Sequence, residues 1–209
     1  MIAVLDYGIG NLRSAQKALQ RVGADAVLVT EPDQAEGAEG VVLPGVGAFG
    51  RCMEALVGSG LHKVALGAVE SGAPFLAICI GMQLLYEGSE EDPGVGGLCV
   101  LPGAVRRLPE GVKRPQMQWN QLELTSPSGG DASGTGLLAG LGHRPWVYFV
   151  HSYAPEMGPD VVATCDYGGP VVAAVERGRT WATQFHPEKS GTTGLRLLRN
   201  FAQACAAAA

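Results

Sequence analysis

Short apolar runs that alternate with helix-like stretches constrain the fold of this chain more than any other feature. Ile2–Leu5, Ala26–Val29, Val41–Leu43 and Pro74–Ile78 are apolar at nearly every position. Strands that are apolar on both faces are typical of a parallel sheet that helices cover on both sides. The first half of the chain therefore predicts repeated strand–helix units.

Helical spacing fills the gaps between these runs. Residues 11–22 place Leu12, Ala15 and Leu19 near one face, and Asn11 is a suitable N-cap residue. The other expected helices are two between residues 49 and 71, one over residues 81–87 and one over residues 195–204.

The second half of the chain predicts antiparallel strands added to the sheet. Strand-like runs separated by short glycine-rich turns span residues 146–150, 161–165, 171–176 and 180–185. Residues 125–134 are polar and rich in turn formers, which indicates a surface loop. We therefore expect one α/β domain over residues 1–209, with a mostly parallel central sheet, flanking helices and added antiparallel strands.

Composition excludes several classes of protein. The net charge is −5 with no dominant basic patch, so we expect no nucleic-acid partner. No run of about 18 apolar residues and no signal-peptide pattern occurs, so we expect no membrane association and a cytoplasmic location. The five cysteines are scattered and form no C-x-x-C pair, which argues against disulfides and zinc. We expect neither a metal nor a cofactor.

Cys79 is the candidate nucleophile. It follows the apolar strand Pro74–Ile78 and precedes a predicted helix, which is the strand–nucleophile–helix elbow of many hydrolases. A helix N-terminus favours the reactive thiolate. The usual elbow has glycine two residues before the nucleophile, whereas this chain has Ala77. The local pattern alone is equally compatible with a buried, inert cysteine.

His186 is the candidate base. His151 and His186 each follow a predicted strand, but only His186 lies in a His-Pro-Glu sequence. Glu188 is two residues away, close enough to orient the imidazole as the third member of a triad. The tripeptide is weak evidence by itself, and it gains weight from an elbow cysteine in the same α/β chain.

The turn Gly45-Val46-Gly47 is the candidate oxyanion site, because glycine lets a backbone turn its N–H groups toward a ligand. We expect one donor from this turn, at Val46 or Gly47, and a second from the N–H of Ile80. Such donors stabilise a developing oxyanion by about 3 kcal/mol each. An ordinary strand–helix turn is the alternative.

Taken together, these motifs resemble the class I glutamine amidotransferases. Within that family the chain is similar to the glutaminase subunits of imidazole glycerol phosphate synthase, which act in histidine biosynthesis. The resemblance covers nearly the whole chain, in the segments Asp6–Leu12, Leu43–Phe49, Ala77–Gln83, Tyr148–Tyr153 and Gln184–Gly191.

The resemblance implies a mechanism. Cys79 attacks the side-chain amide of glutamine, His186 passes a proton to the leaving ammonia, and water hydrolyses the γ-glutamyl thioester to glutamate. The substrate contacts that the resemblance implies are Gly47, Gln83, Glu91, Ser152 and Tyr153. Glu91 lies in an acidic stretch with Glu87, Glu90 and Asp92, so the pattern leaves the choice among these carboxylates open.

The resemblance also implies a partner. In this family a (β/α)8-barrel cyclase subunit uses the ammonia to make imidazole glycerol phosphate and an aminoimidazole carboxamide ribotide. The implied interface residues are Asn11, Met117, Gln118, Trp119, Asn120 and Lys189. The family usually has Pro-His-Met-Gly-Trp-Asn where this chain has Pro115-Gln116-Met117-Gln118-Trp119-Asn120, so glutamine replaces both the histidine and the glycine of this segment.

Other functions stay open at this point. The chain could be the glutaminase subunit of another synthase, such as one that makes anthranilate or pyridoxal phosphate. It could also be an α/β cysteine peptidase or γ-glutamyl hydrolase that acts alone. A binding subunit without activity is a further alternative, although the set Cys79, His186 and Glu188 argues against it.

Overall fold

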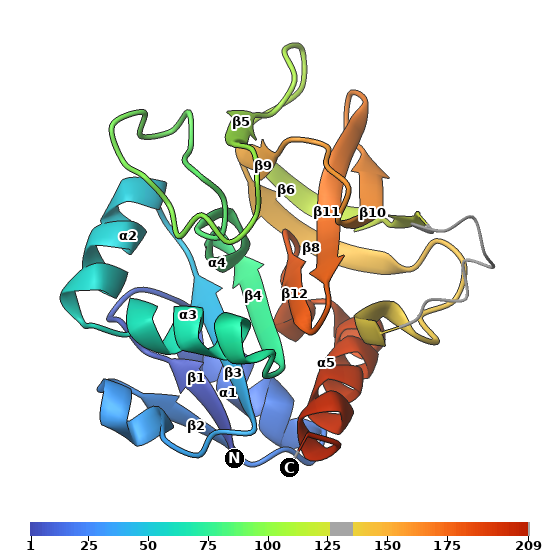
Figure 1. Ribbon diagram of the computed structural model, residues 1–209. Coiled ribbons are helices and arrows are strands. Elements are labelled where there is room, and N and C mark those ends of the chain that lie inside the picture. The colour runs from blue at the N-terminus through green and yellow to red at the C-terminus, as the bar shows by residue number, and fades with distance from the viewer. Residues whose placement is uncertain (126–135, 209) are drawn as a thin grey trace.

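A mostly parallel sheet forms the centre of the computed structural model, which describes residues 1–125 and 136–208 (Figure 1). Its strand order is β2-β1-β3-β4-β12-β11-β10-β7. The bounds are β1 Ile2–Leu5, β2 Ala26–Val29, β3 Gly40–Gly45, β4 Phe75–Cys79, β7 Glu123–Leu124, β10 Val161–Asp166, β11 Pro170–Arg177 and β12 Thr180–Thr183. The α/β class with added antiparallel strands is confirmed.

The parallel half of the sheet is apolar on both faces, as the sequence predicted. All residues of β1, β3 and β4 are buried. Each of these strands pairs in parallel with its neighbours, and helices connect them. The sequence can be apolar at every position here because side chains on both faces leave water.

Two expectations for the second half were wrong. The strand β8, Trp146–His151, does not join the central sheet but pairs with β6, Gln116–Gln121, in a separate two-stranded ribbon. The strand β12 is antiparallel to β11 but parallel to β4, so it completes the parallel part of the sheet. A further ribbon joins β5, Val105–Arg107, to β9, Tyr153–Pro155. Local patterns cannot distinguish these pairings, because partner choice depends on long-range contacts.

The main helices lie close to their expected positions. They are α1 Leu12–Arg21, α2 Phe49–Gly58, α3 His62–Ser71 and α5 Gly191–Ala206, and α1 packs against α5. Short 3-10 turns span Pro32–Ala35, Gly136–Leu138 and Pro187–Lys189. In Figure 1, α3 lies across the front of β3 and β4, and the two ends of the chain lie near each other.

Two details of the helices differ from expectation. The helix after Cys79 is α4, Ile80–Gln83, a single turn instead of the stretch to Glu87. Asn11 does occupy the N-cap position of α1, but its side chain makes no capping hydrogen bond. Residues 126–134 of the expected surface loop lie outside the described residues.

The neighbouring strands β3, β4 and β12 place the candidate site residues together. β3 ends at Gly45, β4 ends at Cys79, and the chain after β12 reaches His186 within a few residues. Because the three strands are parallel, these ends lie at the same edge of the sheet, where ligands bind in open α/β folds. Among the described residues, no helix is long and apolar enough to cross a bilayer.

Candidate active site

Cys79 occupies a sharp backbone turn. Its φ and ψ are 56° and −111°, a conformation that non-glycine residues adopt rarely and mostly at functional sites. The turn brings α4 against β3, where a Cβ on Gly81 would collide with the carbonyl oxygen of Leu43. Ala77, which replaces the usual glycine, is fully buried between Leu43 and Ala182, so its methyl group fits. The elbow geometry expected around Cys79 is confirmed.

His186 is held by the turn that follows β12. Pro187 begins the 3-10 turn Pro187–Lys189, and Ser190 follows the turn as its C-cap residue. The Ser190 hydroxyl donates to the carbonyl of His186 at 2.7 Å and accepts the backbone N–H of Tyr148 at 3.0 Å. The His186 Nδ1 atom lies 2.8 Å from Oε1 of Glu188. The predicted contact between imidazole and carboxylate is therefore present.

The hydrogen bond to Glu188 occupies one ring nitrogen of His186 and leaves the other available for proton transfer. The side chains of His186 and Glu188 are only 2% and 3% exposed. Burial lowers the pKa of His186, but the adjacent Cys79 and Glu188 together outweigh it and raise the pKa above its usual value. Nδ1 faces Glu188, whereas Nε2 is buried without a hydrogen-bond partner among the described residues. A buried imidazole held in this way can exchange a proton with a neighbouring group.

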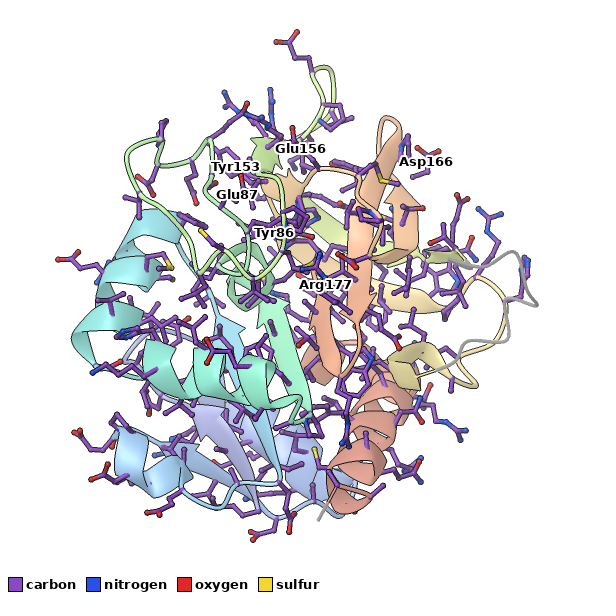
Figure 2. The ribbon with its side chains drawn as sticks, viewed as in Figure 1. Tyr86, Glu87, Tyr153, Glu156, Asp166 and Arg177 are labelled. Atoms are coloured by element: carbon purple, nitrogen blue, oxygen red, sulfur yellow. The ribbon has the colours of Figure 1, made fainter. Side chains whose placement is uncertain are left out.

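A cavity of about 200 Å³ brings Cys79 and His186 together with most of the other predicted site residues. Its walls include every expected oxyanion and substrate residue, namely Val46, Gly47, Ile80, Gln83, Glu91, Ser152 and Tyr153. Of the four acidic residues between positions 87 and 92, only Glu91 lines it. Tyr153 begins β9, in the upper half of the molecule as Figure 2 draws it.

His151 also lines the cavity, but both of its ring nitrogens are occupied. Nδ1 lies 2.9 Å from the carbonyl oxygen of Tyr153, and Nε2 lies 2.9 Å from the side-chain amide of Gln116. Burial, together with the nearby His186, lowers the pKa of His151 to about 4. The contacts on both ring nitrogens hold this histidine in place, whereas His186 has a free nitrogen beside the thiol.

The buried His151 predicts a loss of stability in acid. In the unfolded chain a histidine titrates near about 6.5, so between pH about 6.5 and about 4 only the unfolded state binds the extra proton. The free energy of unfolding therefore keeps the contribution of His151 above pH about 6.5, and it falls by roughly 3 kcal/mol as the pH is lowered to about 4. Urea unfolding at several pH values should show this loss in the wild type and a smaller one in His151→Gln. Equal pH dependence of the two proteins would contradict the assignment.

The expected interface residues cluster only in part. Trp119 packs edge-on against Tyr148 with ring centroids 6.0 Å apart, and the Lys189 ammonium lies 6.0 Å from the centre of the same ring. Met117 and Trp119 are 62% and 47% exposed, which is unusual for large apolar side chains. The other three members of the set lie in different surroundings. Asn11 lines a small cavity beside His186, and Gln118 is exposed. The side-chain amide of Asn120 donates to the carbonyl of Asp166 at 2.9 Å.

Sequence reasoning missed Gln184. Its side chain is fully buried, and its Nε2 atom lies 3.7 Å from the sulfur of Cys79. The signal was present in the sequence, because side chains alternate along an extended segment and Gln184 shares a side with His186 two residues later. The contact itself joins residues 105 positions apart, and it depends on the pairing of β4 with β12.

Comparisons with known proteins agree with this geometry. The family model described as "Glutamine amidotransferase class-I" matches residues 3–205. A relative from Methanothermobacter thermautotrophicus, named imidazole glycerol phosphate synthase subunit HisH, is 49% identical over 204 residues, covering 97% of this chain and 98% of the relative. A relative of the same name from Synechococcus sp. (strain JA-3-3Ab) is 48% identical, with 97% and 93% covered.

Solved structures share the fold. A crystal structure of a glutamine amidotransferase matches with a TM-score of 0.72 and 25% identity, covering 98% of both chains. The structure of PurLQS from Thermotoga maritima matches with a TM-score of 0.73 at 19% identity, covering 96% of both chains, which shows likeness of fold alone. Since the family model spans nearly the whole sequence and the relatives are almost half identical to it, this chain belongs to the class I glutamine amidotransferase family.

Proposed function

We propose that this chain hydrolyses glutamine to glutamate and ammonia as the glutaminase subunit of an imidazole glycerol phosphate synthase. One observation carries the proposed chemistry: the free Nε2 of His186 and the thiol of Cys79 share one cavity, while Glu188 holds the other ring nitrogen. The choice of synthase is supported by the relatives of that name, which match over 97% of this chain.

Acylation is the first proposed step. The Cys79 thiolate adds to the side-chain carbonyl carbon of glutamine, and the carbonyl oxygen becomes an oxyanion. The imidazolium of His186 then gives its proton to the amide nitrogen, the carbon–nitrogen bond breaks, and ammonia leaves. Glu188 stabilises the imidazolium and keeps the ring oriented through its hydrogen bond to Nδ1.

Deacylation reverses these roles. His186, now neutral, takes a proton from water, and the hydroxide adds to the γ-glutamyl thioester. Collapse of the second tetrahedral intermediate breaks the carbon–sulfur bond and releases glutamate, which returns Cys79 to the thiolate. The N–H groups of Ile80 and of Val46 or Gly47 are the proposed oxyanion donors, since these residues line the cavity beside Cys79.

The proposed substrate contacts differ in which hydrogen-bonding atoms they have left for glutamine. Glu91 accepts the backbone N–H of Phe49 through Oε2 at 2.9 Å, which leaves Oε1 for the substrate ammonium group. The Gln83 Nε2 atom already donates to two oxygens, so only its Oε1 atom, which is buried without a partner, is available for a substrate donor. Gly47, Ser152 and Tyr153 complete the proposed set.

A cyclase partner is part of the proposal. We propose that a (β/α)8-barrel subunit takes up the ammonia and makes imidazole glycerol phosphate and an aminoimidazole carboxamide ribotide. The exposed Met117 and Trp119, and Lys189 near the Tyr148 ring that Trp119 contacts, support a contact surface on this side of the chain. Asn11, Gln118 and Asn120 are the remaining proposed contacts. In keeping with this biosynthetic role, we also propose that residues 1–209 act as one glutaminase domain in the cytoplasm.

The partner should control the rate of glutamine hydrolysis. We expect the isolated chain to be slow, because both oxyanion donors must face the substrate and one missing donor costs about 10²-fold or more. Addition of a cyclase subunit and its nucleotide ligand should raise glutamate release by about that factor. The measurement is glutamate release from glutamine by the chain alone, with cyclase, and with cyclase plus nucleotide.

The possible outcomes separate the alternatives. Full activity of the chain alone would keep the catalytic residues and point to a self-sufficient hydrolase. Activation by a different synthase, but not by the cyclase, would replace the proposed pathway. No glutamate release under any condition would refute the proposed activity.

A further inference from the structure

The helix after the nucleophile is too short to account for a thiolate by itself. α4 has four residues, whereas the field of a helix N-terminus grows with aligned peptide units. Other donors must therefore supply part of the stabilisation. Among the described residues, and besides His186, two polar atoms lie close to the Cys79 sulfur: Nε2 of Gln184 at 3.7 Å and the carbonyl oxygen of Val150 at 3.9 Å. Only the first of these two can donate to a thiolate.

The orientation of the Gln184 amide is fixed by a chain of hydrogen bonds. The carbonyl oxygen of Tyr153 can only accept, so the Gln83 atom 2.9 Å from it must be the amide nitrogen. The same nitrogen donates to Oε1 of Gln184 at 2.9 Å. With its oxygen engaged there, Gln184 presents its amide nitrogen to the sulfur of Cys79.

The Tyr153 carbonyl, where this series of hydrogen bonds begins, is itself held in place. The Tyr153 carbonyl also faces Nδ1 of His151 at 2.9 Å, and Nε2 of that ring lies beside the amide of Gln116 on β6. The side chains of Gln83 and Gln184 are 1% and 0% exposed, so water does not compete for these bonds. A reversal of the Gln184 amide would place its nitrogen against the amide nitrogen of Gln83 and cost a buried hydrogen bond.

We propose that Gln184 stabilises the thiolate of Cys79 through its amide N–H, and that Gln83 positions Gln184 for this task. The inference deepens the proposed function, because it rests on Cys79 being the nucleophile. It gives the nucleophile a second donor, two residues before His186, and one that keeps its proton throughout the reaction. A hydrogen bond to a charged acceptor is stronger than one to a neutral acceptor, so this contact favours the thiolate over the thiol.

Alkylation of Cys79 tests the proposal without glutamine or a partner. Iodoacetamide reacts with thiolates, and its rate at Cys79 can be followed from pH 5 to 10 by peptide mass mapping. In Gln184→Leu we expect the neutral-pH rate to fall about tenfold and the midpoint of the pH profile to rise by about one unit, as loss of one charge-assisted hydrogen bond predicts. Exposed Cys99 provides an internal reference in every sample.

Two further variants complete the test. Gln83→Leu leaves Gln184 in place but removes its orienting donor, so a smaller decrease of about threefold is expected. Gln203→Leu, at an exposed position of α5, should leave the profile of Cys79 unchanged. If Gln184→Leu does not fold, as judged by thermal denaturation, the result with Gln83→Leu decides.

Results that would contradict the role of Gln184 differ from results that would contradict the proposed glutaminase activity. A wild-type profile in folded Gln184→Leu, or in Gln83→Leu where that variant decides, would overturn the inference. If Cys79 alkylation responds to Gln184 but no glutamate is released even with the cyclase and its nucleotide, the inference stands and the proposed function is refuted. Restoration of most of the rate by Gln184→His, which keeps an N–H donor, would support donation over packing.

Discussion

Glutamine-dependent synthesis should be lost in Cys79→Ala, while synthesis supplied with free ammonia should continue. Removal of the nucleophile in a triad enzyme lowers kcat by about 10⁴-fold or more. Alanine is small enough for the buried site, and the sharp turn at φ 56° constrains it no more than cysteine. The measurement compares product formation from glutamine and from ammonium salt in the complex with the cyclase.

Complex formation provides the control for this prediction. Cys79 is 3% exposed and lies inside the cavity, so its replacement should not alter the affinity for the partner. Cys99→Ala, which changes an exposed cysteine, should keep both activities. Retention of glutamine-dependent synthesis in Cys79→Ala would refute the assignment of Cys79 as the nucleophile.

The second large effect is expected for Glu188→Gln. Oε1 of Glu188 faces the protonated Nδ1 of His186 at 2.8 Å, and this contact stabilises the imidazolium that forms during catalysis. An amide of the same shape can donate a hydrogen bond to Nδ1, which selects the tautomer that has its proton on Nε2. A comparable change in a catalytic triad lowers kcat by about 10⁴-fold, and we expect a decrease of about 10³ to 10⁴ here. Steady-state kinetics of the complex should place the loss in kcat and not in KM.

A matched control is available in the same protein. Glu87→Gln makes the same chemical change at an exposed carboxylate that does not line the cavity, and its kcat should be unchanged. A loss in KM alone for Glu188→Gln would indicate that this residue binds substrate instead of orienting His186. A kcat close to wild type would remove Glu188 from the proposed mechanism.

The sequence was most informative where signals are local. Burial of every residue in β1, β3 and β4 follows from continuous apolar runs, and the helical spacing before and after them gave the α/β class. The contact between His186 and Glu188 was also accessible, because two residues separated by one proline have few relative arrangements. The elbow at Cys79 was predicted from its place after a strand, despite the alanine at position 77.

Partner choice among strands was not accessible from local patterns. The runs that became β8 and β12 have similar strand-like character, yet β8 pairs with β6 outside the central sheet and β12 lies beside β4. Strand propensity reports how a side chain fits a pleated surface, and it contains little information about which strand lies next to it. The length of α4 was overestimated for a related reason, since the apolar residues after Gln83 are buried by tertiary contacts instead of forming one face of a helix.

By itself, the sequence determined the α/β class, the order of Cys79, His186 and Glu188 along the chain, and the family to which their motifs belong. Only the tertiary structure decided which groups touch the sulfur. Gln184 and Cys79 are 105 residues apart, and the parallel pairing of β12 with β4 brings them to the same edge of the sheet. Hydrogen bonds among buried amides depend on distance and orientation, which periodicity does not encode, so the donor to the nucleophile became visible only in the folded chain.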